Sequence, residues 1–330
     1  MTGYTLRMNT NSPNSHPESW DKYWHGTGTT GAFSAGGVSH PAVQVFWGDF
    51  FQSVAKRYSP PRIVDIATGN GAVLQTALQV LGDESLAMTC VDISDAAIEN
   101  AKQRFPTVTG IVSDATSIPL DDGSFDIVTS QFGVEYAGTD ALTEAARLVA
   151  PGGALGFLMH IENGSVHKEC QDSLAAIDAL RETNFVALAI ELFRNGFAAV
   201  KGADRTPYDA AGSQFAPAVA AAEKIMNDFG TDVAGGTIAR LYEDVAQIHS
   251  RMPNYDPEEV LGWLGGMDAE LLAYAKRMSS MISTVTSRTG IELVCKQLKH
   301  AGLKIGMANE LLFADEELPL AWALIATRPE

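Results

Sequence analysis

The sequence has little cysteine. Its 330 residues include only Cys90, Cys170 and Cys295, which lie far apart. Three distant cysteines provide no CxxC pair, no Cys/His cluster and no disulfide framework. This usage is typical of a reducing compartment, so we expect the protein to be cytoplasmic.

Long hydrophobic runs are also missing. The longest apolar stretch near the C-terminus, Leu318 to Ala326, is too short to span a bilayer. The first twenty residues are polar and rich in Asn, Ser and Pro, without the apolar run of a signal peptide. The sequence therefore predicts a soluble intracellular protein that has no membrane partner.

Basic residues are scarce. Lys and Arg number 23 against 40 Asp and Glu, which gives a formal net charge of -17. A surface this acidic repels phosphate backbones and anionic lipids, so we do not expect a nucleic-acid partner. Hydrophobic residues make up 46% and charged residues 19%, which excludes a mainly disordered chain. The length predicts about two domains, or one domain with a large insertion.

Residues 61–163 alternate short apolar runs with helical patterns. We expect strands at 63–66, 88–92, 109–112, 125–130 and 154–160, and helices at 72–81, 95–105 and 140–149. Strands and helices that alternate at this spacing predict an α/β fold, with a doubly wound parallel sheet and helices on both faces.

The flanking segments differ in pattern. Residues 1–60 read as a polar tail followed by a helical cap segment, which Pro60 and Pro61 end. Residues 164–266 are alanine-rich and helical, and we interpret them as an insertion that serves as a lid or as a dimerisation element. Residues 267–330 return to the core with a last helix over 268–300 and a terminal strand pair that ends at Thr327.

The sharpest local feature is the run from Val64 to Leu74, where a strand enters a glycine turn that opens a helix. Such a turn lets a ligand approach the backbone, and the helix N-terminus offers unpaired N–H groups. A dinucleotide fingerprint needs a third glycine where Leu74 stands. Asp65 would repel a pyrophosphate but suits a ligand that bears an ammonium group. Asp65 has a second interpretation, as a structural carboxylate that orders the turn.

This sequence resembles the class I S-adenosylmethionine-dependent methyltransferases. The similarity rests on five motifs in order within residues 62–160: Asp65 to Gly71, Val91 to Ser94, Ser113 to Ala115, Ile118 to Asp126, and Leu148 to Gly153. It implies a seven-stranded, mostly parallel Rossmann-like sheet with a helical insertion after the fifth strand. It also implies S-adenosylmethionine as cofactor and S-adenosylhomocysteine as product.

The resemblance also implies roles for particular residues. Asp92 would accept the two ribose hydroxyls and Ile93 would lie against the adenine. Asp114 and Ala115 would bind the adenine amino group and a ring nitrogen. The methionine portion would lie over the glycine turn. The cofactor-binding residues implied in this way are Asp65, Ala67, Gly69, Asn70, Gly71, Asp92, Ile93, Asp114, Ala115, Gln131 and Phe132.

Candidates for the acceptor side lie at strand ends and in the N-terminal aromatic cluster. His160 ends the fifth strand and is the best candidate for a general base, although a structural role stays open. Tyr136 is the second catalytic candidate. Tyr23, Trp24 and Glu135 are candidates for substrate binding. No histidine has a metal-ligand spacing, so we expect no metal.

The sequence therefore predicts a methyltransferase that acts on a small molecule, and a homodimer follows if residues 164–266 serve as the dimerisation element. Two alternatives use the same cofactor site. One is a non-catalytic S-adenosylmethionine-binding module, and the other is an enzyme of aminopropyl transfer or cyclopropane formation. An NAD-linked oxidoreductase ranks below these because Leu74 breaks the dinucleotide fingerprint.

Overall fold

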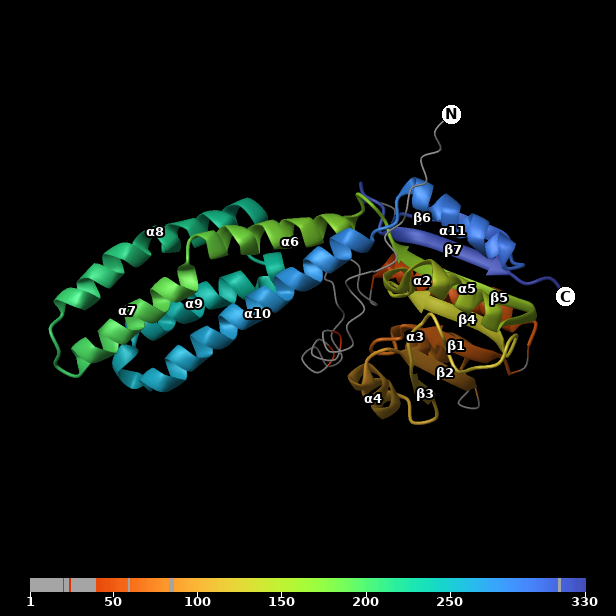
Figure 1. Cartoon of the computed structure of the whole chain (residues 1–330), viewed down its shortest axis with the longest axis horizontal. Coiled ribbons are helices and arrows are strands. Elements are labelled where there is room, and N and C mark those ends of the chain that lie inside the picture. Colours follow the sequence, from red (N-terminus) through yellow and green to blue (C-terminus); the bar gives the residue numbers. More distant parts are fainter. Residues whose placement is uncertain (1–19, 21–23, 25–39, 59, 83–85, 314–315) are drawn as a thin grey trace, which may run out of the picture. The chain divides into compact units, whose positions relative to one another are not determined.

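A computed structural model describes residues 20, 24, 40–58, 60–82, 86–313 and 316–330 (Figure 1). The chain divides into two units. The first, here called the sheet unit, comprises residues up to His167 together with Thr284–Glu330. The second, the helical unit, comprises Lys168–Ser283. No helix within the described ranges is long and apolar enough to cross a membrane.

Seven strands form the sheet of the sheet unit, in the order β3-β2-β1-β4-β5-β7-β6. They are β1 (Arg62–Ile66), β2 (Ala87–Asp92), β3 (Thr109–Val112), β4 (Phe125–Gln131), β5 (Val149–His160), β6 (Lys304–Leu311) and β7 (Ala321–Thr327). All neighbouring pairs from β3 to β5 are parallel, whereas β7 is antiparallel to both β5 and β6. The predicted seven-stranded, mostly parallel sheet is confirmed.

Helices cover both faces of this sheet. They are α2 (Pro41–Ala55), α3 (Ala72–Leu81), α4 (Asp95–Arg104), the 3-10 turn η1 (Val134–Ala137), α5 (Gly138–Leu148) and α11 (Arg288–His300). Leu155 and Phe157 of β5 share a buried cluster with residues of α5 and α11. Gly156, which points to the opposite face, lies against Phe50 of α2.

The strand order reverses between β1 and β4, because the chain runs from β1 outward to β3 and then returns to β4. In open parallel sheets, ligands bind beyond the carboxyl ends of the strands at such a reversal. The glycine turn after β1 and the loop after β4 both leave the sheet at this point.

The helical unit has its own core. Its elements are α6 (Ser165–Glu182), α7 (Phe185–Val200), α8 (Thr206–Phe229), η2 (Val233–Gly236), α9 (Thr237–Ser250), η3 (Met252–Asn254) and α10 (Pro257–Thr284), of which α6 begins within the sheet unit (Figure 1). Buried side chains from each of the long helices, among them Phe185, Phe193, Phe215, Leu241 and Leu264, form one apolar cluster.

The structure moves the boundary that the sequence suggests near residue 266. Gly265 and Gly266 lie inside α10, which continues unbroken to Thr284. Two glycines weaken a helix by about 2 kcal/mol, but burial of Leu264 and Met267 on the same helix compensates for this. The helix expected over 268–300 is instead interrupted at Thr286, which forms a β-bridge with Ile161, and Ser287 then caps α11.

Candidate functional site

The glycine turn after β1 uses three left-handed backbone positions. Ala67, Gly69 and Gly71 have φ values of 54°, 52° and 77°. The Thr68 N–H donates to the carbonyl of Val91 on β2 at 3.1 Å, so the turn is fixed to the neighbouring strand. Gly71 is the N-cap of α3, and no side chain caps this helix. Backbone N–H groups at the start of α3 are therefore available at the carboxyl edge of the sheet.

Asp92, the last residue of β2, holds this turn. Its Oδ2 accepts the Gly69 N–H at 2.9 Å and its Oδ1 accepts the Ser94 N–H at 3.0 Å. The residue is 7% exposed. The carboxylate of Asp92 is therefore fixed between the glycine turn and the residue that caps α4. Ile93 follows at the same edge and is half-buried.

Asp65 lies beneath the turn. Its two oxygens accept hydrogen bonds from the hydroxyls of Thr68 and Thr129, at 2.7 and 2.8 Å. The residue is only 1% exposed, and burial raises the pKa of its carboxyl to about 7. These contacts correspond to the structural interpretation of Asp65, in which the carboxylate orders the turn.

The loop after β4 packs directly on the glycine turn. A Cβ at Gly133 would lie 2.4 Å from the Cβ of Ala67, so glycine is required for this approach. Phe132 adopts a left-handed conformation with φ 53°, and its N–H donates to the Leu158 carbonyl at 2.8 Å. The side-chain oxygen of Gln131 accepts from the indole N–H of Trp47 at 2.6 Å.

Glu135 and His160 form a buried pair at the ends of β4 and β5. Glu135 Oε1 accepts the backbone N–H of His160 at 2.9 Å and lies 2.7 Å from His160 Nδ1. Each side chain is only 2% exposed. The Phe132 ring lies 4.6 Å from the imidazole, and the Tyr136 ring meets it edge-on at 5.8 Å. The structure thus brings together three residues that the sequence separated into catalytic and substrate-binding roles.

Two tryptophans of the N-terminal segment are described. A Cβ at Gly69 would lie 2.4 Å from the Trp24 ring, so this indole covers the turn. The Trp24 carbonyl accepts from Asn100 Nδ2 on α4 at 3.0 Å. The Trp20 ring meets Tyr136 edge-on at 5.3 Å. Tyr23, the other aromatic candidate in this segment, lies outside the described residues.

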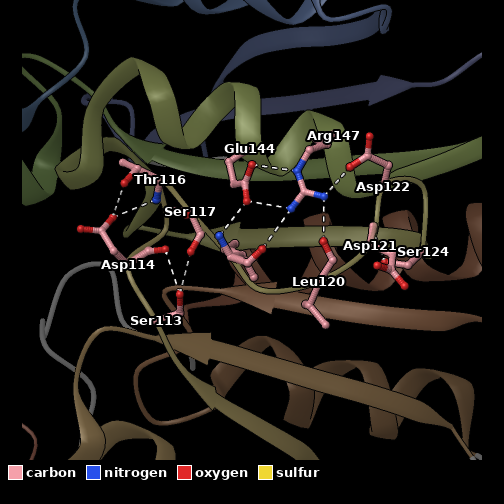
Figure 2. Close-up of polar contacts among 11 residues, drawn as sticks. Ser113, Asp114, Thr116, Ser117, Leu120, Asp121, Asp122, Ser124, Glu144 and Arg147 are labelled. Atoms are coloured by element: carbon pink, nitrogen blue, oxygen red, sulfur yellow. Dashed lines mark hydrogen bonds and ion pairs between the residues drawn. The ribbon is translucent and has the colours of Figure 1, made fainter.

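Asp114 and Ala115 follow β3 beside the end of β2. The Ser113 N–H donates to the Asp92 carbonyl at 2.8 Å, which fixes the start of this loop. Asp114 is exposed, and its Oδ1 accepts both the N–H and the hydroxyl of Thr116 at 2.8 Å, as Figure 2 shows. This loop therefore lies next to Asp92, where the sequence expects the adenine.

A polar network that sequence reasoning missed supports the same loop (Figure 2). Arg147 of α5 donates to both oxygens of Glu144, to Asp122, and to the carbonyls of Ile118 and Leu120. Glu144 also accepts the Ile118 N–H at 2.6 Å. Apart from the Arg147–Glu144 pair, whose members are three residues apart on α5, these contacts join residues 25 to 29 positions apart, so no local pattern could reveal them.

Arg104 is a second residue that the sequence did not single out. It donates to the Asn70 carbonyl within the glycine turn and, at 2.6 Å, to Gln75 of α3. A Cβ at Gly71 would lie 2.7 Å from the neighbouring Phe105 ring. The C-terminal end of α4 therefore also supports the turn.

Within the ranges that the structure describes, no group of three or more His, Cys, Asp or Glu residues could hold a metal ion. The chemistry of the site is instead that of hydrogen-bond acceptors, backbone N–H groups and aromatic rings.

Comparison with known proteins relates part of the sheet unit to methyltransferases. Residues 63–153 match the family model described as "Methyltransferase domain". The demethylmenaquinone methyltransferase of Beutenbergia cavernae is 34% identical over 96 residues, which cover 28% of this chain and 38% of that protein. The ubiquinone/menaquinone biosynthesis C-methyltransferase UbiE of Methylobacterium nodulans is 38% identical over 104 residues, which cover 29% of this chain and 41% of that protein.

Among solved structures, geranyl diphosphate C-methyltransferase from Streptomyces coelicolor is 16% identical, with a TM-score of 0.34. The match covers 44% of this chain and 64% of that one. The chain spans about two fifths of the length of the demethylmenaquinone methyltransferase and of UbiE.

Residues 63–153 form a methyltransferase domain of the class I S-adenosylmethionine-dependent type. The cofactor of this domain is S-adenosylmethionine. The residues present fit that group: Gly69 has no side chain and so allows close approach to the backbone of the turn, and the Asp92 carboxylate lies at the end of the adjacent strand, bonded to that turn.

Proposed function

We propose that the whole chain is an S-adenosylmethionine-dependent methyltransferase acting on a small-molecule acceptor. One observation carries the proposal: the glycine turn after β1 is bonded through Gly69 to the carboxylate that ends β2. This places turn, acid and helix N-terminus together where the strand order reverses. Leu74 stands where a dinucleotide fingerprint needs its third glycine, which disfavours a dinucleotide cofactor.

In this proposal Asp92 accepts the ribose hydroxyls, and Gly69, Asn70 and Gly71 lie along the methionine portion. Ile93 contacts the adenine, while Asp114 and Ala115 bind its polar edge. The hydrogen bond from the Ser113 N–H to the Asp92 carbonyl supports this assignment, because it keeps the segments that carry Asp92 and Asp114 adjacent.

Asp65, Ala67, Gln131 and Phe132 are assigned a supporting role around the cofactor. Asp65 uses both oxygens on Thr68 and Thr129, and Gln131 is bonded to Trp47. We therefore propose that the side chains of Asp65 and Gln131 support the walls of the cofactor site through these hydrogen bonds. Ala67 and Phe132 join the glycine turn to the loop after β4.

The acceptor side is assigned to His160 and Tyr136 as catalytic candidates, and to Glu135, Trp24 and Tyr23 as acceptor-binding candidates. S-adenosylmethionine, when bound, supplies an electrophilic methyl group on a sulfonium, and an acceptor lone pair displaces sulfur in line. The chain's own residues then have to align the acceptor and exclude water. The buried aromatic rings around His160 suit that task.

Similarity to demethylmenaquinone methyltransferases supports a small-molecule acceptor. Because the match covers only 28% of this chain, the small-molecule acceptor is part of what we propose. The role of the helical unit, as lid or as dimerisation element, stays a prediction.

The test is turnover. The full chain is incubated with S-adenosylmethionine and a set of small phenols, quinols and amines, and the products are measured by mass spectrometry. The proposal expects S-adenosylhomocysteine in step with a product that gains one methyl group. Cofactor binding without S-adenosylhomocysteine would favour the non-catalytic module. A parallel incubation with decarboxylated S-adenosylmethionine and the same amines tests aminopropyl transfer, which would release methylthioadenosine.

A further inference from the structure

We propose that Glu135 and His160 act as a pair in which His160 is the general base and Glu135 its positioning residue, and that the acceptor carries an aromatic hydroxyl. This inference rests on the proposed function, because it concerns the acceptor side of the same site.

The geometry fixes which nitrogen takes the proton. Glu135 Oε1 lies 2.7 Å from His160 Nδ1 and also accepts the backbone N–H of His160. An ionised carboxylate only accepts, so Nδ1 carries the hydrogen and Nε2 is the basic nitrogen. A second bond to the backbone of the same residue locks the carboxylate in place.

The surroundings make the charge of Glu135 effective. Both side chains are only 2% exposed, so their attraction is weakly screened by water. A proton taken at Nε2 creates an imidazolium beside the carboxylate, which stabilises it. This buried ion pair forms only when the proton is transferred. Its attraction therefore lowers the barrier of the chemical step rather than strengthening the binding of the acceptor.

The pair lies next to the cofactor turn. Glu135 follows Gly133, which packs on Ala67 of the glycine turn, and precedes Tyr136. The loop after β4 therefore carries Glu135, which contacts His160, directly beside the turn. Phe132 and Tyr136 present their rings to the imidazole and provide an apolar, aromatic surface for a planar acceptor.

The acceptor O–H bond breaks, its electron pair stays on oxygen, and the proton forms an N–H bond at Nε2. The proton then leaves to solvent after methyl transfer. A histidine base matches a phenol, whose pKa is about 10, far better than an aliphatic alcohol, and this match selects the acceptor class.

The test compares two probe acceptors, 2-naphthol and 4-nitrophenol, at about pH 8, where the nitrophenol is largely ionised and the naphthol is not. For the wild type we expect both to be methylated. Glu135→Gln removes the charge and keeps the shape. It should lower kcat for 2-naphthol by about 10²-fold, within the range of general-base effects, and change the rate for 4-nitrophenol little. His160→Gln should show the same split.

A matched control exists in the sheet unit. Glu316 accepts from His40 at 2.9 Å in a second, more exposed Glu–His pair. Glu316→Gln should leave both rates unchanged. Equal losses for both probes in Glu135→Gln and His160→Gln would assign the pair a structural role and overturn the proposal. Methylation of neither phenol by the wild type would overturn the acceptor class.

Two further measurements complete the design. Calorimetric titration with S-adenosylhomocysteine tests the proposed function separately, since absent binding in the wild type contradicts that function rather than this pair. If the variants do not fold, NMR of wild-type chain labelled with ¹⁵N-histidine replaces them. We expect one exchange-protected imidazole N–H from His160, and a spectrum without it would contradict the pair.

Discussion

Asp65 is a buried acid whose ionisation changes on folding. Burial raises the pKa of its carboxyl to about 7, against about 4 in an unfolded chain. The folded state therefore binds more protons than the unfolded state between these values. It follows that the contribution of Asp65 to the free energy of unfolding is fully present below about pH 4 and is lost as the pH rises to about 7.

Asp65→Asn removes this titration while an amide can still bond to Thr68 and Thr129. We expect the stability of the variant, relative to wild type, to improve by up to about 4 kcal/mol between about pH 4 and pH 7. The measurement is thermal unfolding of both chains by calorimetry across this pH range. The transition to follow is the one whose midpoint S-adenosylhomocysteine shifts.

The matched control is Asp126→Asn. The Arg62 guanidinium bonds to Asp126 and holds the pKa of that carboxyl below its usual range, so its titration lies below about pH 4. The control should be less stable than wild type by an amount that is constant over the same window. A constant difference for Asp65→Asn as well would contradict the assigned titration of Asp65.

At the scale of elements, the glycine turn is the most constrained segment of the site. A Cβ at Gly69 would meet the Trp24 ring at 2.4 Å, and φ is 52°. Gly69→Ala should therefore weaken the binding of S-adenosylhomocysteine at least tenfold, through strain of about 1 kcal/mol and the lost approach to the backbone. Gly48→Ala is the control, because a Cβ at Gly48 of α2 has nothing within 4 Å. Isothermal titration of a folded Gly69→Ala chain with wild-type affinity would contradict the role of the turn.

The loop between β3 and β4 depends on the fork geometry of Arg147. Lysine cannot reproduce its contacts to Glu144, Asp122 and two carbonyls. We expect Arg147→Lys to destabilise the sheet unit by about 1–3 kcal/mol in chemical denaturation. Arg194→Lys, at a surface pair with Glu191 whose arginine is 62% exposed, should cost less than about 1 kcal/mol. Equal effects of the two substitutions would show that the network adds nothing beyond a surface pair.

The elements that the sequence predicts well are those whose signals are local. The helix over 72–81 and the strand over 109–112 have the predicted bounds, and Ser94 caps α4 with its hydroxyl accepting from the Ala97 N–H. The break expected near Gly266 is wrong because packing inside the helical unit overrides the weak helix propensity of glycine.

The candidate site divides in the same way. Asp92 follows from its position at the end of a strand, but its bond to Gly69 spans 23 residues. The pairing of Glu135 with His160 depends on β4 and β5 lying side by side, and the fork of Arg147 depends on α5 packing over the β3–β4 loop. Such contacts are set by tertiary structure, which periodicity and capping do not encode.

At the scale of the whole molecule, the two units have separate cores. The sheet-unit segments that lead into and out of the helical unit are hydrogen-bonded to each other. The Thr286 N–H donates to the His160 carbonyl at 2.8 Å, and the Glu162 N–H donates to the Thr286 carbonyl at 3.1 Å. Replacing residues 168–283 with a short Gly/Ser linker therefore costs little chain entropy, because the segments on either side of the deletion are already hydrogen-bonded to each other. The shortened chain should fold and bind S-adenosylhomocysteine with nearly wild-type affinity. A chain that folds but no longer binds the cofactor would show that the sheet unit does not hold it alone.

The most direct test of the central claim is a calorimetric titration of the full chain with S-adenosylhomocysteine, alongside Asp92→Ala and the exposed-acid control Asp121→Ala. We expect one site in the wild type, no binding of NAD, and a loss of about 1.5–3 kcal/mol in Asp92→Ala, roughly ten- to a hundredfold in Kd, while Asp121→Ala binds as the wild type does. Binding of NAD in place of S-adenosylhomocysteine, or unchanged affinity in a folded Asp92→Ala chain, would contradict the account.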